Sequence, residues 1–287
     1  MVVSFNPDDG FEKRLAALSA QVSETIVVDN TTKPADRARV VAICRRLGCV
    51  LHANGENVGV AEALNRGVSA ARQRGATAVL TMDHDSSPSS DMVAELLTTL
   101  NDARAAGLRV GLVAPGVIDG ATGRGGPDRG DVRVWRETTL AITSGSLVPL
   151  SVFESVGLFR SDFFIDCVDQ EFCLRLREHG YRVVQSHRAL LIHHLGSPRL
   201  HHVLGRTFIP TNHPPSRRFY MARNLVWTSK LLLLSQPRVV LPMMFKLVKA
   251  AVLIAGLEEN KLAKLRAIAS GVIAGIGTRP GRPPRLA

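Results

Sequence analysis

Short apolar runs alternate with amphipathic segments over residues 2–114, and this alternation constrains the fold more than any other feature. The longer segments repeat their apolar side chains at helical spacing, and the runs between them have strand length. Parallel strands joined by crossover helices produce this pattern. The sequence therefore predicts an α/β domain with a mostly parallel sheet between two layers of helices. The expected strands are Val2–Asn6, Thr25–Val28, Cys49–Leu51, Thr77–Met82 and Val110–Ala114, and the expected helices are Gly10–Ser23, Ala35–Leu47, Asn57–Arg74 and Asp91–Ala106.

The regular alternation ends after residue 114. Residues 119–133 contain five glycines and six charged residues, so we expect a long, mobile loop there. Beyond it, the patterns predict one or two strands within 135–148, helices near 151–156 and 169–179, and short strands at 181–185 and 189–192.

The C-terminal part of the chain is strongly basic. Residues 174–287 hold 19 of the 36 Lys and Arg residues but 3 of the 25 Asp and Glu residues, a net charge of +16. Residues 1–173 have a net charge of −5. This asymmetry indicates a separate role at the C-terminal end, in contact with an anionic membrane surface, a diphosphate or a nucleic acid.

The most hydrophobic stretch, residues 225–257, is interrupted by Lys, Arg and two prolines, which is not typical of a transmembrane helix. It suits helices lying in a membrane interface, and equally helices packed on the domain or between copies of the chain. We therefore expect a domain of residues 1–224 and a basic helical extension of residues 225–287, with a disordered tail from Arg279.

Asp83-His84-Asp85 directly follows the fourth expected strand. Two carboxylates one residue apart, at the sheet edge where open α/β folds bind ligands, suit Mg²⁺ or Mn²⁺. A polar turn is the alternative, because Ser86-Ser87-Pro88 follows. His193 and His194 end the last expected strand, where one imidazole could be a third metal ligand or a core residue. Successive strand residues face opposite sides, so we expect one histidine to point each way.

Polar groups at other strand ends could bind a nucleotide. Asp29 and Asn30 follow the second expected strand, and Asp29 could accept from a base or ribose, or cap a turn. Asn57 and Gly59 lie at the start of the third expected helix, Asn57–Arg74, and Asn65 lies further along it. Gly59 would let a ligand approach the backbone near the helix N-terminus, although a plain capped helix explains the same residues.

Two further polar clusters lie in the second half of the chain. Thr143-Ser144-Gly145-Ser146 suits an acceptor pocket or a β-turn. Asp166, Asp169 and Glu171 alternate with apolar residues at the start of a helix, where desolvation would raise the pKa of a carboxyl group and make it a better base. The alternatives are a helix cap for Asp169 and a helical ion pair of Glu171 with Arg175.

In their order along the chain, these clusters resemble family 2 glycosyltransferases with the GT-A fold, and within them the bacterial rhamnosyltransferase branch. The resemblance covers about residues 2–230. Many members of that family have Glu-Asp where this chain has Val168-Asp169, which retains the Asp. The motifs that carry the resemblance are Val-Val-Asp-Asn at 27–30, Asn-Val-Gly-Val-Ala at 57–61, Asp-His-Asp-Ser at 83–86, Thr-Ser-Gly-Ser at 143–146, Phe-Phe-Ile-Asp-Cys-Val-Asp-Gln-Glu-Phe-Cys-Leu-Arg at 163–175 and Tyr-Met-Ala-Arg-Asn at 220–224.

The resemblance implies an enzyme that moves a sugar from a nucleotide diphosphate to a hydroxyl group with inversion. Mg²⁺ or Mn²⁺ would neutralise the leaving diphosphate while a base deprotonates the acceptor. The implied roles are as follows: Asp169 as the base, with Glu171 as second choice; Asp29, Asn30, Asn57, Gly59, Asn65 and Asp83 at the nucleotide; Asp83, Asp85 and His193, with His194 as second choice, at the metal; and Thr143, Ser144, Gly145, Arg217, Arg218 and Arg223 at the acceptor.

The expected donor is dTDP-L-rhamnose. Galactofuranosyl or other hexosyl transfer is the alternative, since dTDP, UDP and GDP donors share these motifs. The basic region suits the diphosphate of a lipid-linked acceptor, and a polysaccharide is the other acceptor class. We therefore expect a peripheral protein on the cytoplasmic face of a bacterial inner membrane, active in cell-envelope glycan synthesis. Assembly of copies through the C-terminal helices is a further expectation.

Two other classes of protein fit less well. A sugar-1-phosphate nucleotidyltransferase needs a glycine-rich basic loop after the first strand, where this chain has the acidic segment Ser4–Gly10. A nucleic-acid-binding protein would interleave aromatic and basic residues, and this chain is only 5% aromatic. We therefore expect no nucleic-acid partner.

Overall fold

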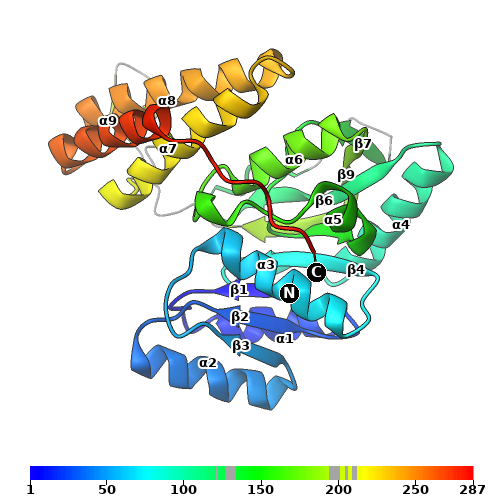
Figure 1. Cartoon of the computed structure of the whole chain (residues 1–287). Coiled ribbons are helices and arrows are strands. Elements are labelled where there is room, and N and C mark those ends of the chain that lie inside the picture. Colours follow the sequence, from blue (N-terminus) through cyan, green and yellow to red (C-terminus); the bar gives the residue numbers. More distant parts are fainter. Residues whose placement is uncertain (121, 127–133, 194–200, 204–205, 209–211, 287) are drawn as a thin grey trace.

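The computed structural model describes residues 1–120, 122–126, 134–193, 201–203, 206–208 and 212–286. A central sheet lies between helices, and three C-terminal helices lie to one side (Figure 1). The strands are β1 (Val2–Ser4), β2 (Ile26–Asp29), β3 (Val50–Ala53), β4 (Ala78–Asp83), β5 (Ser87–Pro88), β6 (Val110–Asp119), β7 (Trp135–Thr138), β8 (Ser146–Pro149), β9 (Arg182–His193), β10 (His201–Val203) and β11 (Arg206–Phe208). The helices are α1 (Phe11–Ser19), α2 (Pro34–Leu47), α3 (Val60–Gln73), α4 (Met92–Ala105), α5 (Leu150–Val156), the 3₁₀ helix η1 (Ser161–Phe163), α6 (Val168–Glu178), α7 (Pro215–Leu232), α8 (Pro237–Leu257) and α9 (Lys261–Gly277).

The main sheet joins two halves that differ in strand direction. Its order is β3-β2-β1-β4-β8-β6-β9-β5, with β7 also paired to β9. The first four strands pair in parallel, as predicted, whereas β8 runs antiparallel to both β4 and β6. The described residues between β6 and β8 form no crossover helix, which a parallel neighbour would need. The α/β class is confirmed, and the sheet is mixed beyond β4.

Strands β6 and β9 are longer than predicted. β6 continues through Pro115 to Asp119, and β9 joins the two expected short strands into one. The register between them shifts between Ala114 and Gly116, an irregularity that accommodates a proline inside a strand. The extension carries His193 to the sheet edge beside β5. Most of the predicted loop 119–133 lies outside the described residues.

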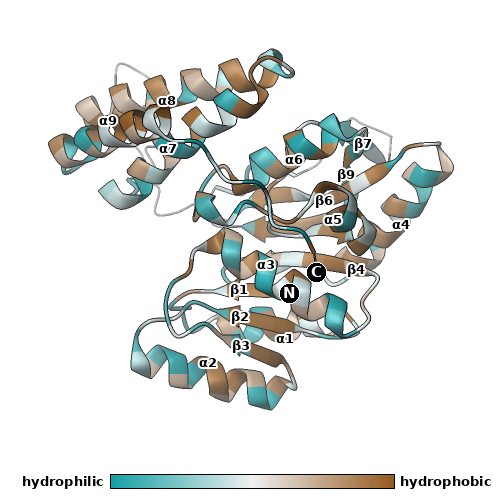
Figure 2. Cartoon of the chain, viewed as in Figure 1, coloured by the Kyte–Doolittle hydropathy of each residue, from teal (hydrophilic) through white to brown (hydrophobic). Residues whose placement is uncertain are grey.

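Alternation along the strands separates two hydrophobic cores. Val3 and Val28 face the core under α3, α5 and α6, whereas Val2 and Val27 face the core under α1, α2 and α4. Figure 2 shows the hydrophobic strands between helices whose outer residues are hydrophilic. The predicted three-layer arrangement is therefore present, with the carboxyl ends of β1, β2 and β4 at one edge.

The three C-terminal helices pack on one another beside the sheet domain (Figure 1). Helices α7 and α9 approach closely because Gly271 and Gly275 face α7: a Cβ atom at Gly271 would meet the Phe219 carbonyl oxygen, and one at Gly275 would lie 2.7 Å from Val226 Cβ. Helix α7 runs through residue 224 without a break, so the predicted domain boundary falls inside a helix.

The residues after α9 return to the sheet domain as an extended strap, drawn in red in Figure 1. The Leu158 N–H donates to the Pro284 carbonyl at 2.7 Å, and the Gly281 N–H donates to Asp162 Oδ2 at 2.6 Å. Leu286 packs against the core under α3. The expected disorder from residue 279 is not observed in residues 279–286, because this segment finds hydrogen-bond and apolar partners on the domain.

Candidate active site

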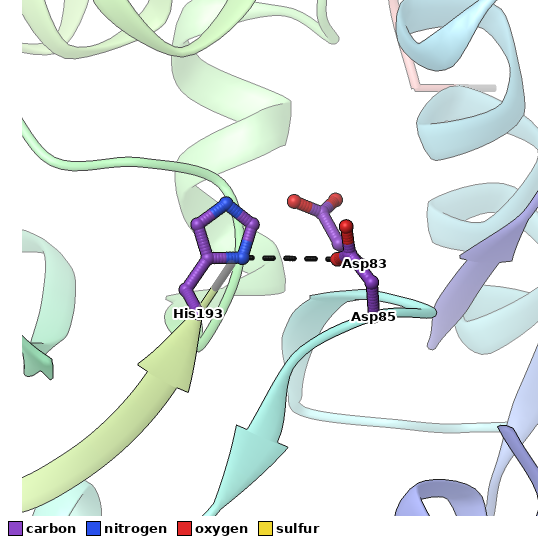
Figure 3. A group of neighbouring side chains, drawn as sticks. All are labelled: Asp83, Asp85 and His193. Carbon is purple, nitrogen blue, oxygen red and sulfur yellow. Dashed lines mark ion pairs between the residues drawn. The ribbon is translucent and has the colours of Figure 1, made fainter. Parts of the chain in front are cut away.

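Asp83, Asp85 and His193 meet at the carboxyl end of β4. Asp83 is the last residue of β4, Asp85 lies in the following turn, and His193 is the last residue of β9. Strand β5 pairs antiparallel with β9, with Ser87 opposite Ile192, and this pairing brings the turn beside the histidine. One ligand atom from each residue lies within 4.8 Å of the others, and the three side chains point toward one another (Figure 3).

The two carboxylates make this cluster electrostatically unfavourable without a counter-charge. Burial, and then the charge of Asp85, raise the pKa of Asp83 to about 7, and Arg217 acts in the opposite direction. Asp85 Oδ1 is buried and has no hydrogen-bond partner among the described residues, with His193 Nδ1 3.7 Å away. A carboxylate oxygen that accepts no hydrogen bond, beside a second carboxylate and an imidazole, belongs to a ligand set that suits Mg²⁺ or Mn²⁺. The residues present therefore fit a divalent cation.

A chain of serine hydroxyls connects the two sides of this cluster. The Asp83 N–H donates to Ser144 Oγ at 3.1 Å, and the Ser144 hydroxyl donates to Ser86 Oγ at 2.8 Å. Ser86 Oγ lies 2.7 Å from His193 Nδ1 and accepts the Nδ1 hydrogen in the tautomer whose Nε2 is free to bind a metal. Outer partners of this kind orient a metal-binding imidazole. The sequence analysis gave Ser86 no role, although it directly follows the acidic pair.

Ser144, which was expected at the acceptor, belongs to this series of serine hydroxyls. Ser144 is fully buried, and its hydroxyl is used within the cluster. Gly145 has a φ of 78° in the turn before β8, and its N–H donates to the Thr81 carbonyl at 2.7 Å. Thr143 lies on the wall of a small cavity that Asp169 also lines. The β-turn expected as the alternative is thus present, and Thr143 is the member of the run nearest the base candidate.

Asp169 lies in the first turn of α6. Burial raises its pKa to about 6, although the Gln170 N–H, 2.9 Å from Asp169 Oδ1, acts to lower it; Asp166 and Asp83 raise it further. A carboxyl group with a pKa near 6 is ionised at neutral pH and is a stronger base than an exposed Asp.

Glu171, the second candidate for the base, is held in ion pairs. Its carboxylate is 2% exposed and accepts from Arg160 at 2.8 Å and from Arg175 at 2.9 Å. The pair with Arg175 is the helical i,i+4 contact named as the alternative. This geometry leaves Asp169 as the available base candidate of the two.

The residues expected at the nucleotide gather at the ends of β2 and β3. Asp29 Oδ1 accepts from Ser4 Oγ at 2.7 Å and from Thr31 Oγ1 at 2.5 Å. Asn30 Nδ2 donates to the Gly59 carbonyl at 3.1 Å, which ties β2 to the start of α3. Asn57 Oδ1 accepts the Gly59 N–H at 3.0 Å. Four of the expected residues therefore share one corner of the sheet edge.

The structure explains Gly59 and Asn65 without a ligand. Gly59 has a φ of 86°, and a Cβ atom there would lie 2.5 Å from the Phe164 ring, so the close approach is to Phe164. Asn65 Nδ2 donates to the Phe159 carbonyl and to Ser161 Oγ, and Asn65 Oδ1 accepts the Phe159 N–H. Both amide hydrogens of Asn65 are used within the protein, and its contact with the nucleotide stays a prediction.

The three arginines expected at the acceptor have different surroundings. Arg217 makes a two-pronged ion pair with Asp166 and lies close enough to Asp83 to lower its pKa. Arg218 is 3% exposed and forms an ion pair with Glu258, a residue that lies far along the sequence from the acidic cluster. Arg223 donates to the Asp162 carbonyl at 2.6 Å and stacks on Trp227. Arg217 is the one that adjoins the acidic cluster.

Two other histidines adjoin the cluster in sequence. His84 Nδ1 and Nε2 are not part of the three-residue cluster, and burial lowers the pKa of its imidazole. His194 lies outside the described residues.

A mixed sheet flanked by helices, with an acidic pair at the end of its fourth strand, is the arrangement of the GT-A fold. Residues 1–142 match the family model described as Glycosyl transferase family 2. The protein is therefore a glycosyltransferase.

Comparison with particular proteins narrows the resemblance. The chain is 27% identical to dTDP-rhamnosyl transferase RfbF of Shigella flexneri, over 78% of this chain and 77% of that protein. Among solved structures it is similar to the mannosyltransferase PcManGT from Pyrobaculum calidifontis in complex with GDP-Man and Mn²⁺, with a TM-score of 0.57 and 17% identity, covering 96% of this chain and 74% of the other. It also resembles S. aureus TarS, with a TM-score of 0.53 and 14% identity over 97% of this chain, which spans 43% of the length of that protein. These likenesses at low identity show the fold.

Proposed function

We propose that this protein is a metal-dependent, inverting glycosyltransferase that moves L-rhamnose from dTDP-L-rhamnose to a hydroxyl group of a cell-envelope acceptor. The observation that carries the proposal is the group of Asp83, Asp85 and His193 with a buried, unpartnered carboxylate oxygen at the carboxyl edge of the sheet. The name of the Shigella relative supports the choice of donor.

The chemistry follows from charge and proton transfer. Mg²⁺ or Mn²⁺ held by Asp83, Asp85 and His193 would neutralise the negative charge of the leaving diphosphate. Asp169 would accept the proton of the acceptor hydroxyl while its oxygen attacks the anomeric carbon. The carbon–oxygen bond to the diphosphate breaks on the opposite face, and the diphosphate leaves with the electron pair. Attack opposite the leaving group inverts the configuration.

The nucleotide is assigned to the corner formed by Asp29, Asn30 and Asn57. These side chains lie at the ends of β2 and β3, on the same sheet edge as Asp83. Open α/β sheets bind ligands at this edge. We assign Asp83 to the ribose or to the metal, because it ends β4 on this edge and adjoins Asp85.

We further propose that the acceptor is lipid-linked, with a polysaccharide acceptor as the other outcome, and that the helical extension rests on an anionic membrane surface at its cytoplasmic face. Among the described helices, α8 is long and apolar enough to cross a membrane by length and composition, and 17% of its apolar window is buried. Its exposed residues include Phe245, Val248 and Val252, and Lys246 and Lys249 lie on the same helix. A helix with that composition suits the membrane interface.

The proposal is tested by thermal denaturation with dTDP-L-rhamnose, UDP-galactofuranose and GDP-mannose, each with and without Mn²⁺. A ligand that binds only the folded state raises the midpoint by mass action. We expect the largest Mn²⁺-dependent rise with dTDP-L-rhamnose, and loss of that rise in Asp85→Asn. The exposed Asp91, at the start of α4, supplies a matched control in Asp91→Asn. A larger rise with another donor would replace the sugar assignment, and equal rises without Mn²⁺ would contradict the metal assignment.

A further inference from the structure

The segment Phe163–Cys167, just before α6, has an unusual backbone. Phe164, Asp166 and Cys167 have φ angles of 62°, 65° and 60°. Non-glycine residues rarely adopt positive φ, and such conformations persist only where the surroundings hold them. Cys167 is also the N-terminal cap of α6, two residues before Asp169. The position of the base candidate therefore depends on whatever holds this segment.

Asn224 of α7 is the group that holds it. Its side chain is fully buried, and Asn224 Nδ2 donates to the carbonyl oxygens of Phe163, Ile165 and Asp166 at 2.7, 2.8 and 2.9 Å. Asn224 Oδ1 accepts from the guanidinium of Arg223. Three carbonyl oxygens converge on one amide nitrogen, so the site requires a donor and would repel an oxygen.

The same segment also contacts the acidic cluster and the start of α3. The Phe164 carbonyl accepts the N–H groups of Val60 and Ala61, the first residues of α3, at 2.6 and 3.3 Å. Arg217, two turns before Asn224 on α7, holds the carboxylate of Asp166. Helix α7 thus holds the segment at two points, through Arg217 and Asn224. The segment itself connects the start of α3, beside the nucleotide corner, to α6.

We propose that Asn224 is a positioning residue, which holds Phe163–Cys167 in its strained conformation so that Asp169 is aimed at the acceptor hydroxyl. The inference rests on the proposed function of Asp169. It makes the alignment of the base a property of α7, the helix that also connects the sheet domain to α8 and α9. The side chains of Asp29 and Asn57 bond Ser4, Thr31 and the Gly59 N–H, so Phe164 is the link between the donor corner and the segment that this amide holds.

The test compares Asn224→Asp with Thr228→Val. Asn224→Asp retains the size of the side chain but places oxygen against three carbonyl oxygens. Thr228 is fully buried one turn later on α7, and its hydroxyl donates to the Asn224 carbonyl at 2.8 Å, so Thr228→Val is the matched control. A third variant, Asn224→Ala, serves if Asn224→Asp does not fold.

We expect kcat for transfer from dTDP-L-rhamnose to fall about 10- to 100-fold in Asn224→Asp, because small misplacements of a reacting group cost that much. KM for the donor should change much less than kcat, because the donor corner meets this segment only at Phe164 among the described contacts, and the Mn²⁺-dependent rise in thermal midpoint should stay unchanged. Thr228→Val should keep the wild-type kcat. If Asn224 only stabilised the fold, Asn224→Asp would lower the thermal midpoint without a selective fall in kcat. That result would overturn the inference.

Hydrogen exchange tests whether Asn224 holds the segment Phe163–Cys167, and it needs no catalytic assay. Amides of residues 163–170 should exchange faster in Asn224→Asp or Asn224→Ala than in the wild type and Thr228→Val. Unchanged exchange there would refute the inference even if the protein used a different donor. Absence of transfer by the wild-type protein with every donor would instead refute the proposed function.

Discussion

Asp169→Asn should stabilise the protein at neutral pH while abolishing transfer. Burial raises the pKa of Asp169 from 3.8 to about 6. Because this pKa is higher in the folded than in the unfolded state, the stabilisation it brings is complete below pH 3.8 and is lost as the pH rises through about 6. Above that pH the folded protein carries a buried negative charge that the unfolded chain solvates better. Asparagine has no such charge at any pH.

The magnitude follows from the size of the shift. About two pKa units correspond to about 3 kcal/mol, because each unit is worth about 1.4 kcal/mol. Part of this gain of the Asn variant is offset, because the Gln170 N–H bonds a carboxylate more strongly than an amide, so about 3 kcal/mol is the upper value. We therefore expect a net gain of about 1–2 kcal/mol in the free energy of unfolding at pH 7.5, shrinking toward zero below pH 4.

Urea denaturation at pH 7.5, 6 and 4, read by circular dichroism, measures this gain. Transfer should fall about 10²- to 10⁴-fold, the usual contribution of a general base. Asp91→Asn, at an exposed acid, should change neither quantity. Retained transfer in Asp169→Asn would refute the base assignment, and equal stability at all three pH values would refute the raised pKa.

Four further changes test other parts of the structure. Asp85→Asn should abolish the Mn²⁺-dependent rise in thermal midpoint and lower the pKa of Asp83, because the Asp85 charge raises it; an unchanged Mn²⁺ response would exclude Asp85 as a ligand. Ser86→Ala removes the hydroxyl beside His193 Nδ1 and should weaken Mn²⁺ binding about 10- to 100-fold, measured by calorimetry; unaltered affinity would show that the serine chain has no role in binding. Gly275→Leu would place a side chain against Val226 on α7 and should lower stability by about 1–3 kcal/mol in urea denaturation. Phe245→Asp, on the exposed face of α8, should weaken sedimentation with anionic vesicles while leaving transfer to a soluble acceptor intact; equal sedimentation would point to packing between copies, which analytical ultracentrifugation detects.

Part of the site was predictable because it follows from local sequence. The positions of Asp29 and Asp83 at strand ends come from apolar runs whose periodicity depends on near neighbours along the chain. The edge of a parallel sheet collects the carboxyl ends of its strands, so the position of both residues at one edge followed from the fold class. The raised pKa of Asp169 was likewise expected, since apolar residues surround it in sequence.

The surroundings of other site residues could not be predicted, because they depend on which buried polar groups pair. Asn65 looked available for a ligand, but the segment carrying Phe159 and Ser161 uses its whole amide. Ser144 looked like an acceptor contact, but it bonds the acidic turn and Ser86. Each of these partners lies far away in sequence, and no local pattern encodes the pairing.

The sequence by itself determined an α/β fold, the acidic pair beyond its fourth strand and the basic character of its C-terminal part. Local hydrophobic periodicity and composition are sufficient for these properties, because they arise from neighbouring residues. The tertiary structure alone decided that β8 enters the sheet antiparallel, that His193 meets Asp85, and that Asn224 holds the segment before Asp169. Those outcomes depend on sheet register and helix packing, where the need to satisfy buried polar groups selects one arrangement among many that the local patterns allow.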